Sequence, residues 1–168
     1  MAAKDLKAIA NYFIEKSFIE NKLLTPMQLQ KLIFFAHGVN LAVHESPLIK
    51  EEFEAWDYGP VIRSLYFETK YYGSGNIDRK LTALSYKKNS SKFNLEIITP
   101  IISQEDKTVK EILDFVWENY GKYNAIQLSN ITHKVGTPWE VTYKKGVKGV
   151  IIPNEVIKQY YQSRIASR

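Results

Sequence analysis

Histidines are the residues of this sequence best suited to metal binding, and their spacing argues against a shared metal ion. His37 and His44 stand seven residues apart, which in a helix places them on one face but about 10.5 Å apart. Both imidazoles cannot bind one zinc ion directly at that distance, and the chain has no cysteine to complete a site. The sequence therefore predicts no metal site and no cofactor, with both histidines half-buried on a helix.

Two other residue groups have the types needed for catalysis. Ser129 and His133 are i, i+4 neighbours, an arrangement that a nucleophile and its base can take, but no Gly-x-Ser-x-Gly elbow surrounds the serine. Glu51, Glu52 and Glu54 offer paired carboxylates of the kind glycosidases use, without any other sign of a sugar site. We therefore expect no enzyme. A deep pocket lined by Ser129, His133 and a third polar group would favour one.

The composition excludes several further classes of protein. The 168 residues include no cysteine, which excludes disulfide frameworks, thiol catalysis and iron–sulfur clusters. The length indicates one domain over residues 1–168. The first residues lack the apolar core of a signal peptide, and no apolar run approaches the roughly 18 residues of a membrane span. We expect a cytoplasmic protein.

The net charge of +5 is unevenly distributed. Residues 1–60 carry six basic against eight acidic side chains, residues 61–120 nine against eight, and residues 121–168 eight against two. The candidate partner-facing charges are Glu51, Glu52, Glu54 and Asp57 in an acidic stretch, and Arg79, Lys80, Lys87 and Lys88 in a basic one. Nucleic-acid binding through a basic loop at 79–92 and the C-terminal third is an alternative. No recognition motif accompanies these residues, which favours solvated charge.

Hydrophobic periodicity predicts a mainly α fold, a compact bundle of about six to seven helices. The first helix is expected over 4–21. The second, over 27–43, has a complete start signal, with Thr25 as the cap, Pro26 at the first helical position and Gln28 closing a capping box. Because this helix is apolar on most sides, we expect it at the centre of the fold.

The remaining elements follow from turn and capping signals. Gly59-Pro60 is expected to start a third helix, because proline suits the first helical position. Alternating residues predict a small β-hairpin insertion around residues 80–100. Later helices are expected to begin at Ser103, near residue 125, at Thr137 and after Pro153, with a short extended piece over 150–152.

Two tryptophans lie close to these helix-start signals: Trp56 precedes Gly59-Pro60, and Trp139 follows Thr137. Trp56 and Trp139 are both expected to plug connectors into the core, but tryptophan is also a preferred residue of interface hot spots. A half-exposed tryptophan beside Tyr58 or Tyr66 would favour an interface.

Several motifs together resemble a known family. Gln30-Lys31-Leu32, Ala55-Trp56-x-x-Gly59-Pro60-Val61 with Tyr66, and Thr132-His133 followed by Pro138-Trp139 occur in the order and spacing of the Panacea domain, also called the SocA-like or GepA phage-associated domain. The resemblance covers almost the whole chain. It implies a mainly helical domain found in bacteria and their prophages, without enzyme activity or cofactor.

Many members of this family are antitoxins, so the resemblance implies a cognate protein toxin as the partner, encoded by the adjacent gene. Such antitoxins occlude the toxin or pass it to a protease. Some relatives carry an N-terminal DNA-binding segment, whereas this sequence begins its first helix near Lys4, so no separate DNA-binding domain is expected. The alternative hypotheses are a phage or prophage protein that binds another host factor, and the nucleic-acid binder described above.

Overall fold

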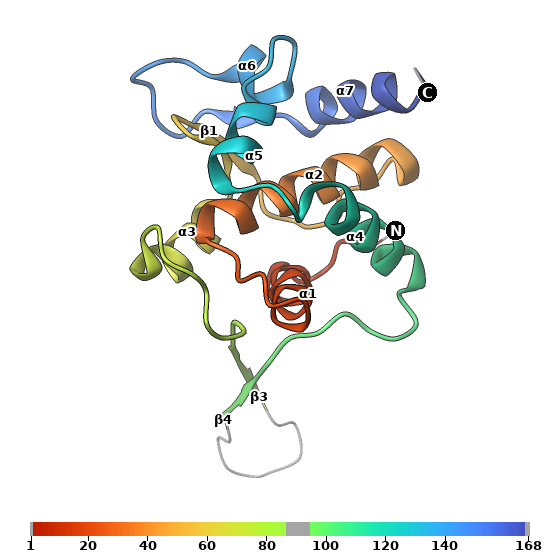
Figure 1. The fold of residues 1–168 in the computed structure, drawn as a ribbon. Coiled ribbons are helices and arrows are strands. Elements are labelled where there is room, and N and C mark those ends of the chain that lie inside the picture. Colours follow the sequence, from red (N-terminus) through yellow and green to blue (C-terminus); the bar gives the residue numbers. More distant parts are fainter. Residues whose placement is uncertain (1, 87–94, 167–168) are drawn as a thin grey trace.

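The computed structural model describes residues 2–86 and 95–166, which are mainly helical as predicted (Figure 1). The helices are α1 (Leu6–Ile19), α2 (Pro26–His44), α3 (Arg63–Thr69), α4 (Lys107–Tyr120), α5 (Ala125–Thr132), α6 (Pro138–Thr142), α7 (Asn154–Ala166) and the 3-10 helix η1 (Lys70–Tyr72). The strands are β1 (Phe53–Trp56), β2 (Gly59–Val61), β3 (Ala83–Tyr86), β4 (Leu95–Ile98) and β5 (Ile151–Ile152). Within the described ranges, no helix combines the length and apolarity needed to cross a bilayer.

Helix α2 is the central helix, as its apolar sequence predicts. The capping box forms: the Gln28 backbone N–H donates to the Thr25 hydroxyl, and the Thr25 N–H donates to the Gln28 side chain. Nearly all side chains from 29 to 41 are buried, because α1, α4, α5 and α7 pack around the helix. Gly38 allows α7 to approach closely: a Cβ there would lie 2.2 Å from the ring of Tyr161.

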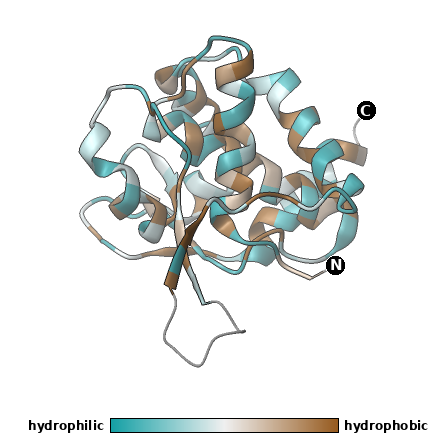
Figure 2. Ribbon diagram, turned by 90° about the horizontal axis from the view of Figure 1, so that it is seen from below, coloured by the Kyte–Doolittle hydropathy of each residue, from teal (hydrophilic) through white to brown (hydrophobic). Residues whose placement is uncertain are grey.

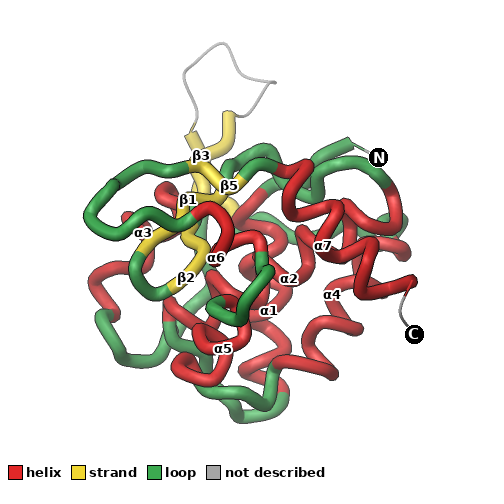
Figure 3. Tube along the Cα trace, turned by 90° about the horizontal axis from the view of Figure 1, so that it is seen from above, coloured by secondary structure: helices red, strands yellow, loops and turns green. Residues whose placement is uncertain are grey.

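The region after α2 differs from the prediction, because Gly59-Pro60 forms a strand and not a helix start. Strands β2, β1 and β5 form an antiparallel sheet in that order, with Trp56 opposite Gly59 across a two-residue turn. The side chain of Gln30 accepts the Ile62 N–H (2.8 Å) and donates to the Ile62 carbonyl (3.1 Å). These bonds hold the backbone extended through Ile62, so α3 begins only at Arg63. The sheet lies at one side of the helical body (Figure 3).

One later helix begins after its predicted start, and another is short. α4 begins at Lys107, because Ser103 accepts the Glu105 N–H in a preceding turn and does not cap the helix. α6 begins as predicted with Thr137 capping, but it ends at Thr142, where Tyr143 turns to an extended conformation. The short extended piece near residue 151 is confirmed as β5.

The predicted hairpin insertion is confirmed by β3 and β4, which pair antiparallel and project from the helical body (Figure 1). One face carries two cross-strand pairs of large exposed side chains, Leu84 with Ile97 and Tyr86 with Leu95. Hydrophobic colouring extends along these strands outside the body (Figure 2). A two-stranded hairpin is marginally stable alone, so its attachment to α1 is important.

Asn11 on α1 provides that attachment, and Asn11→Ala should lower the free energy of unfolding by about 2 to 4 kcal/mol. Its buried amide donates to the carbonyls of Leu81 and Pro100 (both 2.9 Å) and accepts the Leu81 N–H (2.7 Å). Alanine leaves these backbone groups unsatisfied. Urea denaturation measures the free energy of unfolding. The control Asn119→Ala removes one exposed hydrogen bond to the Phe115 carbonyl and should change this free energy by less than about 0.5 kcal/mol. Equal effects would contradict the prediction.

Candidate binding pocket

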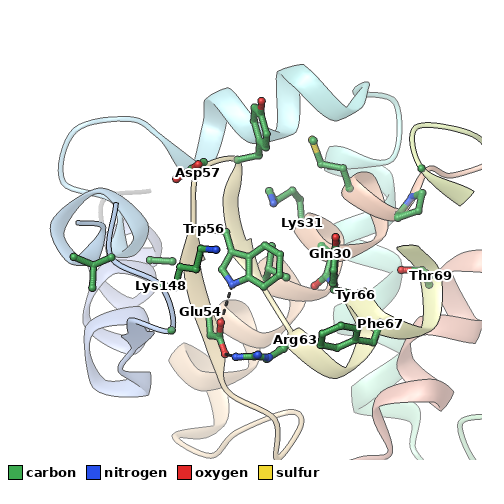
Figure 4. A pocket seen from close by; sticks show the side chains of 18 of the residues that line it. Gln30, Lys31, Glu54, Trp56, Asp57, Arg63, Tyr66, Phe67, Thr69 and Lys148 are labelled. Carbon is green, nitrogen blue, oxygen red and sulfur yellow. Dashed lines mark hydrogen bonds and ion pairs between the residues drawn. The ribbon is translucent and has the colours of Figure 1, made fainter. Parts of the chain in front are cut away.

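A pocket of about 710 Å³ lies between the start of α2, the β1–β2 hairpin, α3 and a loop at 146–149 (Figure 4). Its lining is mainly apolar and aromatic, with a few charged side chains. Three of the charged groups are cations, Lys31, Arg63 and Lys148, and two are the carboxylates of Glu54 and Asp57. The pocket is therefore a concave, mostly apolar site with a small number of placed charges, the usual composition of a ligand site.

Lys31 is the most unusual residue of this pocket, because its side chain is only 1% exposed. It extends from α2 toward β1, and its Nζ donates to the carbonyl of Pro60 (3.1 Å). Burial lowers the pKa of Lys31 from 10.5 to about 7, since removal from water disfavours the charged form. Among the described residues, no carboxylate lies within ion-pair distance of this amine.

Trp56 forms one wall and is half-buried. Its indole N–H donates to Glu54 (2.8 Å), and its ring lies 4.8 Å from the ring of Tyr66. The arrangement of a half-exposed tryptophan beside Tyr66 is the one that favours an interface over a purely structural plug. Trp139, by contrast, is buried and donates to the Trp56 carbonyl (2.7 Å), so it supports β1 from behind.

The predicted exposure of Glu54 is wrong. Glu54 lies in β1 and is 8% exposed, and its carboxylate accepts from Trp56 and lies 3.8 Å from Arg63. In a strand rather than a connector, its side chain turns toward neighbouring elements. Glu52 and Asp57 are exposed and Glu51 is half-buried, with Asp57 accepting a hydrogen bond from the Tyr143 hydroxyl (2.7 Å).

The basic stretch is only partly described. Arg79 lies 3.2 Å from Asp78, and Lys80 forms an ion pair of 3.0 Å with Glu15. Lys87 and Lys88 lie outside the described residues. The two described cations therefore have acidic neighbours, which lowers the positive charge they present to a phosphate backbone.

The suggested Ser129–His133 pair does not form. The Ser129 hydroxyl donates to the Tyr58 carbonyl (3.0 Å), and the His133 ring stacks on Trp139 at 3.7 Å. Burial and the charge of Lys31 lower the pKa of His133. Neither Ser129 nor His133 is among the residues that line the pocket, so the condition that would have favoured an enzyme is not met.

His37 is also placed differently from the half-buried position predicted. It is completely buried, and its Nε2 lies 2.9 Å from the Asn154 Oδ1. Burial lowers its pKa to about 4. His44 is half-buried as expected. The described residues contain no group of three side chains suited to holding a metal ion.

The positions that carry the family resemblance collect around the β1–β2 hairpin. Gln30, Lys31, Trp56 and Tyr66 line the pocket, Gly59 and Pro60 form β2, Thr132, His133, Pro138 and Trp139 support the hairpin from α5 and α6, and Leu32 lies in the core. Ser129 and Trp139 each donate to a backbone carbonyl of the hairpin. The motifs thus build one pocket and its support.

Sequence reasoning missed part of this lining. Arg63 and Phe67 from α3 and the loop Gly146-Val147-Lys148-Gly149 all contribute to the pocket. Gly146 and Gly149 have positive φ angles of 77° and 71°. Two glycines that flank a valine and a lysine are a signal for a shaped loop, but nothing in the local sequence indicates which surface that loop faces.

Comparisons with known proteins identify the family of this chain. A family model described as "Antitoxin SocA-like, Panacea domain" matches residues 29–140, which include every motif position above. Antitoxin SocA of Caulobacter vibrioides (strain NA1000 / CB15N) is 31% identical over 137 residues, covering 82% of this chain and 69% of that protein. No solved structure matches the chain significantly. The resemblance read from the motifs is confirmed, and the chain belongs to the antitoxin SocA-like, Panacea domain family.

Proposed function

We propose that this protein is a cytoplasmic antitoxin that neutralises a cognate protein toxin, encoded by the adjacent gene, by binding it directly and without catalysis. Family membership carries the proposal, because a curated antitoxin is 31% identical over most of this chain. The pocket agrees with it, since Ser129 and His133 do not line that site, and of the three glutamates considered from the sequence only Glu54 does, engaged with Trp56 and Arg63.

The aromatic residues around the pocket are the proposed contact surface. Tyr58, Tyr66 and Phe67 are 69%, 38% and 52% exposed, and they lie beside the half-buried Trp56. Tyrosine, tryptophan and arginine dominate the binding energy of protein interfaces, usually around a central pocket. Arg63 completes this combination: it lies 5.9 Å from the Phe67 ring.

Exposed acidic residues at the same edge extend this surface. Glu52 and Asp57 flank β1, while Glu54 is engaged with Trp56 and Arg63. Acidic groups suit a toxin with a basic active site, and such complementarity accelerates association more than it strengthens binding. Of the acidic stretch, Glu52 and Asp57 are therefore better candidates than Glu54 for contact with the toxin.

Co-expression with the adjacent gene tests the proposal. We expect the neighbouring product alone to stop growth and this protein to restore it, with the two proteins co-purifying. A toxin that remains at its normal level would indicate occlusion, and one that disappears would indicate delivery to a protease; both require direct binding. A non-toxic neighbour, or toxicity that persists without complex formation, would overturn the proposal.

A matched pair of variants locates the contact. Phe67→Ala should weaken toxin binding at least tenfold, because truncating a hot-spot aromatic costs about 2 to 4 kcal/mol. Phe115→Ala makes the same change at a similarly exposed residue of α4, outside the pocket, and should alter binding less than about twofold. Calorimetry of the purified pair measures both. Equal effects, or a larger loss with Phe115→Ala, would place the interface elsewhere.

A further inference from the structure

The amine of Lys31 has an environment that is incomplete for a cation. It is 1% exposed and has one neutral acceptor, the Pro60 carbonyl. An ammonium group has three donors, and a buried charge without a counterion costs several kcal/mol. The fold tolerates this arrangement on the wall of an open pocket. Lys31 thus needs either to lose its proton or to receive an anion.

The acidic groups of the pocket do not meet this need. Glu54 accepts from Trp56 and pairs with Arg63, and Asp57 accepts from the Tyr143 hydroxyl. Both carboxylates are therefore directed to other partners. An anion that pairs with Lys31 would therefore come from outside the described residues.

The side chains that form the walls of the pocket indicate which kind of chemical group carries this anion. The rings of Trp56 and Tyr66 lie 4.8 Å apart, and the Phe67 ring lies 5.6 Å from Tyr66, which gives one continuous aromatic wall. Arg63 stands beside the same wall. Aromatic surface favours an apolar group, while Lys31 deep in the lining favours a negative charge.

We propose that this pocket binds a carboxylate carried on an apolar or aromatic group, with Lys31 as its counterion, and that the toxin supplies it as an acidic side chain next to an apolar one. The inference rests on the proposed function. It specifies the chemistry of the contact: the apolar group lies against Trp56 and Tyr66, and the carboxylate accepts from the Lys31 amine. Lys31 then acts as a specificity determinant.

Calorimetry with 3-phenylpropanoate and 3-phenylpropanamide tests the chemistry, because these probes share the apolar part and differ only in the end group, a carboxylate or a neutral amide. The wild-type chain should bind the acid at least tenfold more tightly than the amide. At pH 7.5 the acid should also draw a fraction of a proton from the buffer, because a neighbouring carboxylate raises the pKa of Lys31. Equal binding of acid and amide would overturn the proposal without any variant.

Two variants test whether Lys31 is the group that binds the proton taken up with the acid. Other titratable groups near the site are Glu54, Asp57 and Tyr58 of the β1–β2 region, Arg63 and Tyr66 of α3, His133 behind the hairpin, and Lys148 of the loop. Lys31→Met should abolish both the preference for the acid and the proton uptake. Lys107→Met, the same change at an exposed lysine of α4 outside the pocket, should leave both in place. Uptake that persists in Lys31→Met would contradict the assignment.

The toxin itself tests the source of the carboxylate. Lys31→Met should weaken toxin binding at least tenfold, and 3-phenylpropanoate should compete with the toxin for the wild-type chain. If 3-phenylpropanoate binds but neither Lys31→Met nor the added acid affects toxin binding, the toxin does not supply the carboxylate. This inference then fails while the proposed function stands. If the wild-type chain binds no toxin, the proposed function fails, and the probe experiment alone decides the chemistry of the pocket.

Discussion

Gly59→Ala is expected to lower the free energy of unfolding by about 3 to 5 kcal/mol. Gly59 has a φ of +104°, a backbone conformation that a residue with a Cβ adopts only with strain. A Cβ at this position would also lie 2.6 Å from the Thr132 hydroxyl and 2.7 Å from Cε of Lys31. Both neighbours are buried, so neither can move away freely.

Gly136→Ala is the matched control for this change. Gly136 also has a positive φ of 80°, but a Cβ there meets nothing within 4 Å. It should therefore lose only about 1 to 2 kcal/mol, the strain of the left-handed conformation. Urea denaturation of both variants separates the two effects. Equal losses would show that the close approach to Lys31 and Thr132 contributes nothing.

The contacts at Gly59 also explain why distant motifs occur together. Lys31 of α2, Gly59 of β2 and Thr132 of α5 meet at one point, and each leaves room for the other two. A side chain at Gly59 would displace the Lys31 amine or the α5 helix. The strand, the buried lysine and the threonine are therefore a single packing unit beneath the pocket, although about a hundred residues separate them along the chain.

Local signals identify most of the helices but not the small sheet. The Thr25–Gln28 capping box and the apolar sequence after it correctly predict the start and central place of α2. The prediction that Gly59-Pro60 starts a helix is wrong, because proline suits both the first turn of a helix and an extended edge. The deciding interaction is the pair of hydrogen bonds from Gln30 to Ile62, thirty-two residues away. No local pattern contains that information.

The same limit applies to the site. The family motifs identify Lys31, Trp56 and Tyr66, but the burial of Glu54 depends on its place in β1 between β2 and β5. An alternation of acidic and apolar residues over 51–57 reads equally well as an exposed connector or as a strand with a paired carboxylate. The loop at 146–149 reaches the pocket only through the pairing of β5 with β1. Tertiary pairing thus decides these positions.

Lys31 should also make stability depend on pH in an unusual direction. Its pKa is about 7 in the folded state and near 10.4 in the unfolded chain. Between these values the unfolded state binds more protons, so stability should rise as the pH increases from about 7 to about 10. The slope from this group is at most about 1.4 kcal/mol per pH unit.

Lys31→Met isolates this contribution, because methionine fills most of the same space without a charge. At pH 7 the variant should be more stable than the wild-type chain, since it avoids the burial of an unpaired amine. The difference should shrink as the pH rises toward 10, where the unfolded wild-type chain no longer gains from protonating Lys31. Urea denaturation of both proteins at several pH values measures it, with the exposed Lys148→Met as the control that should follow the wild-type curve. Parallel curves for wild type and Lys31→Met would show that the lysine keeps its proton in the folded state. A counterion bound in the folded protein would then already occupy the position that we propose for the carboxylate of the toxin.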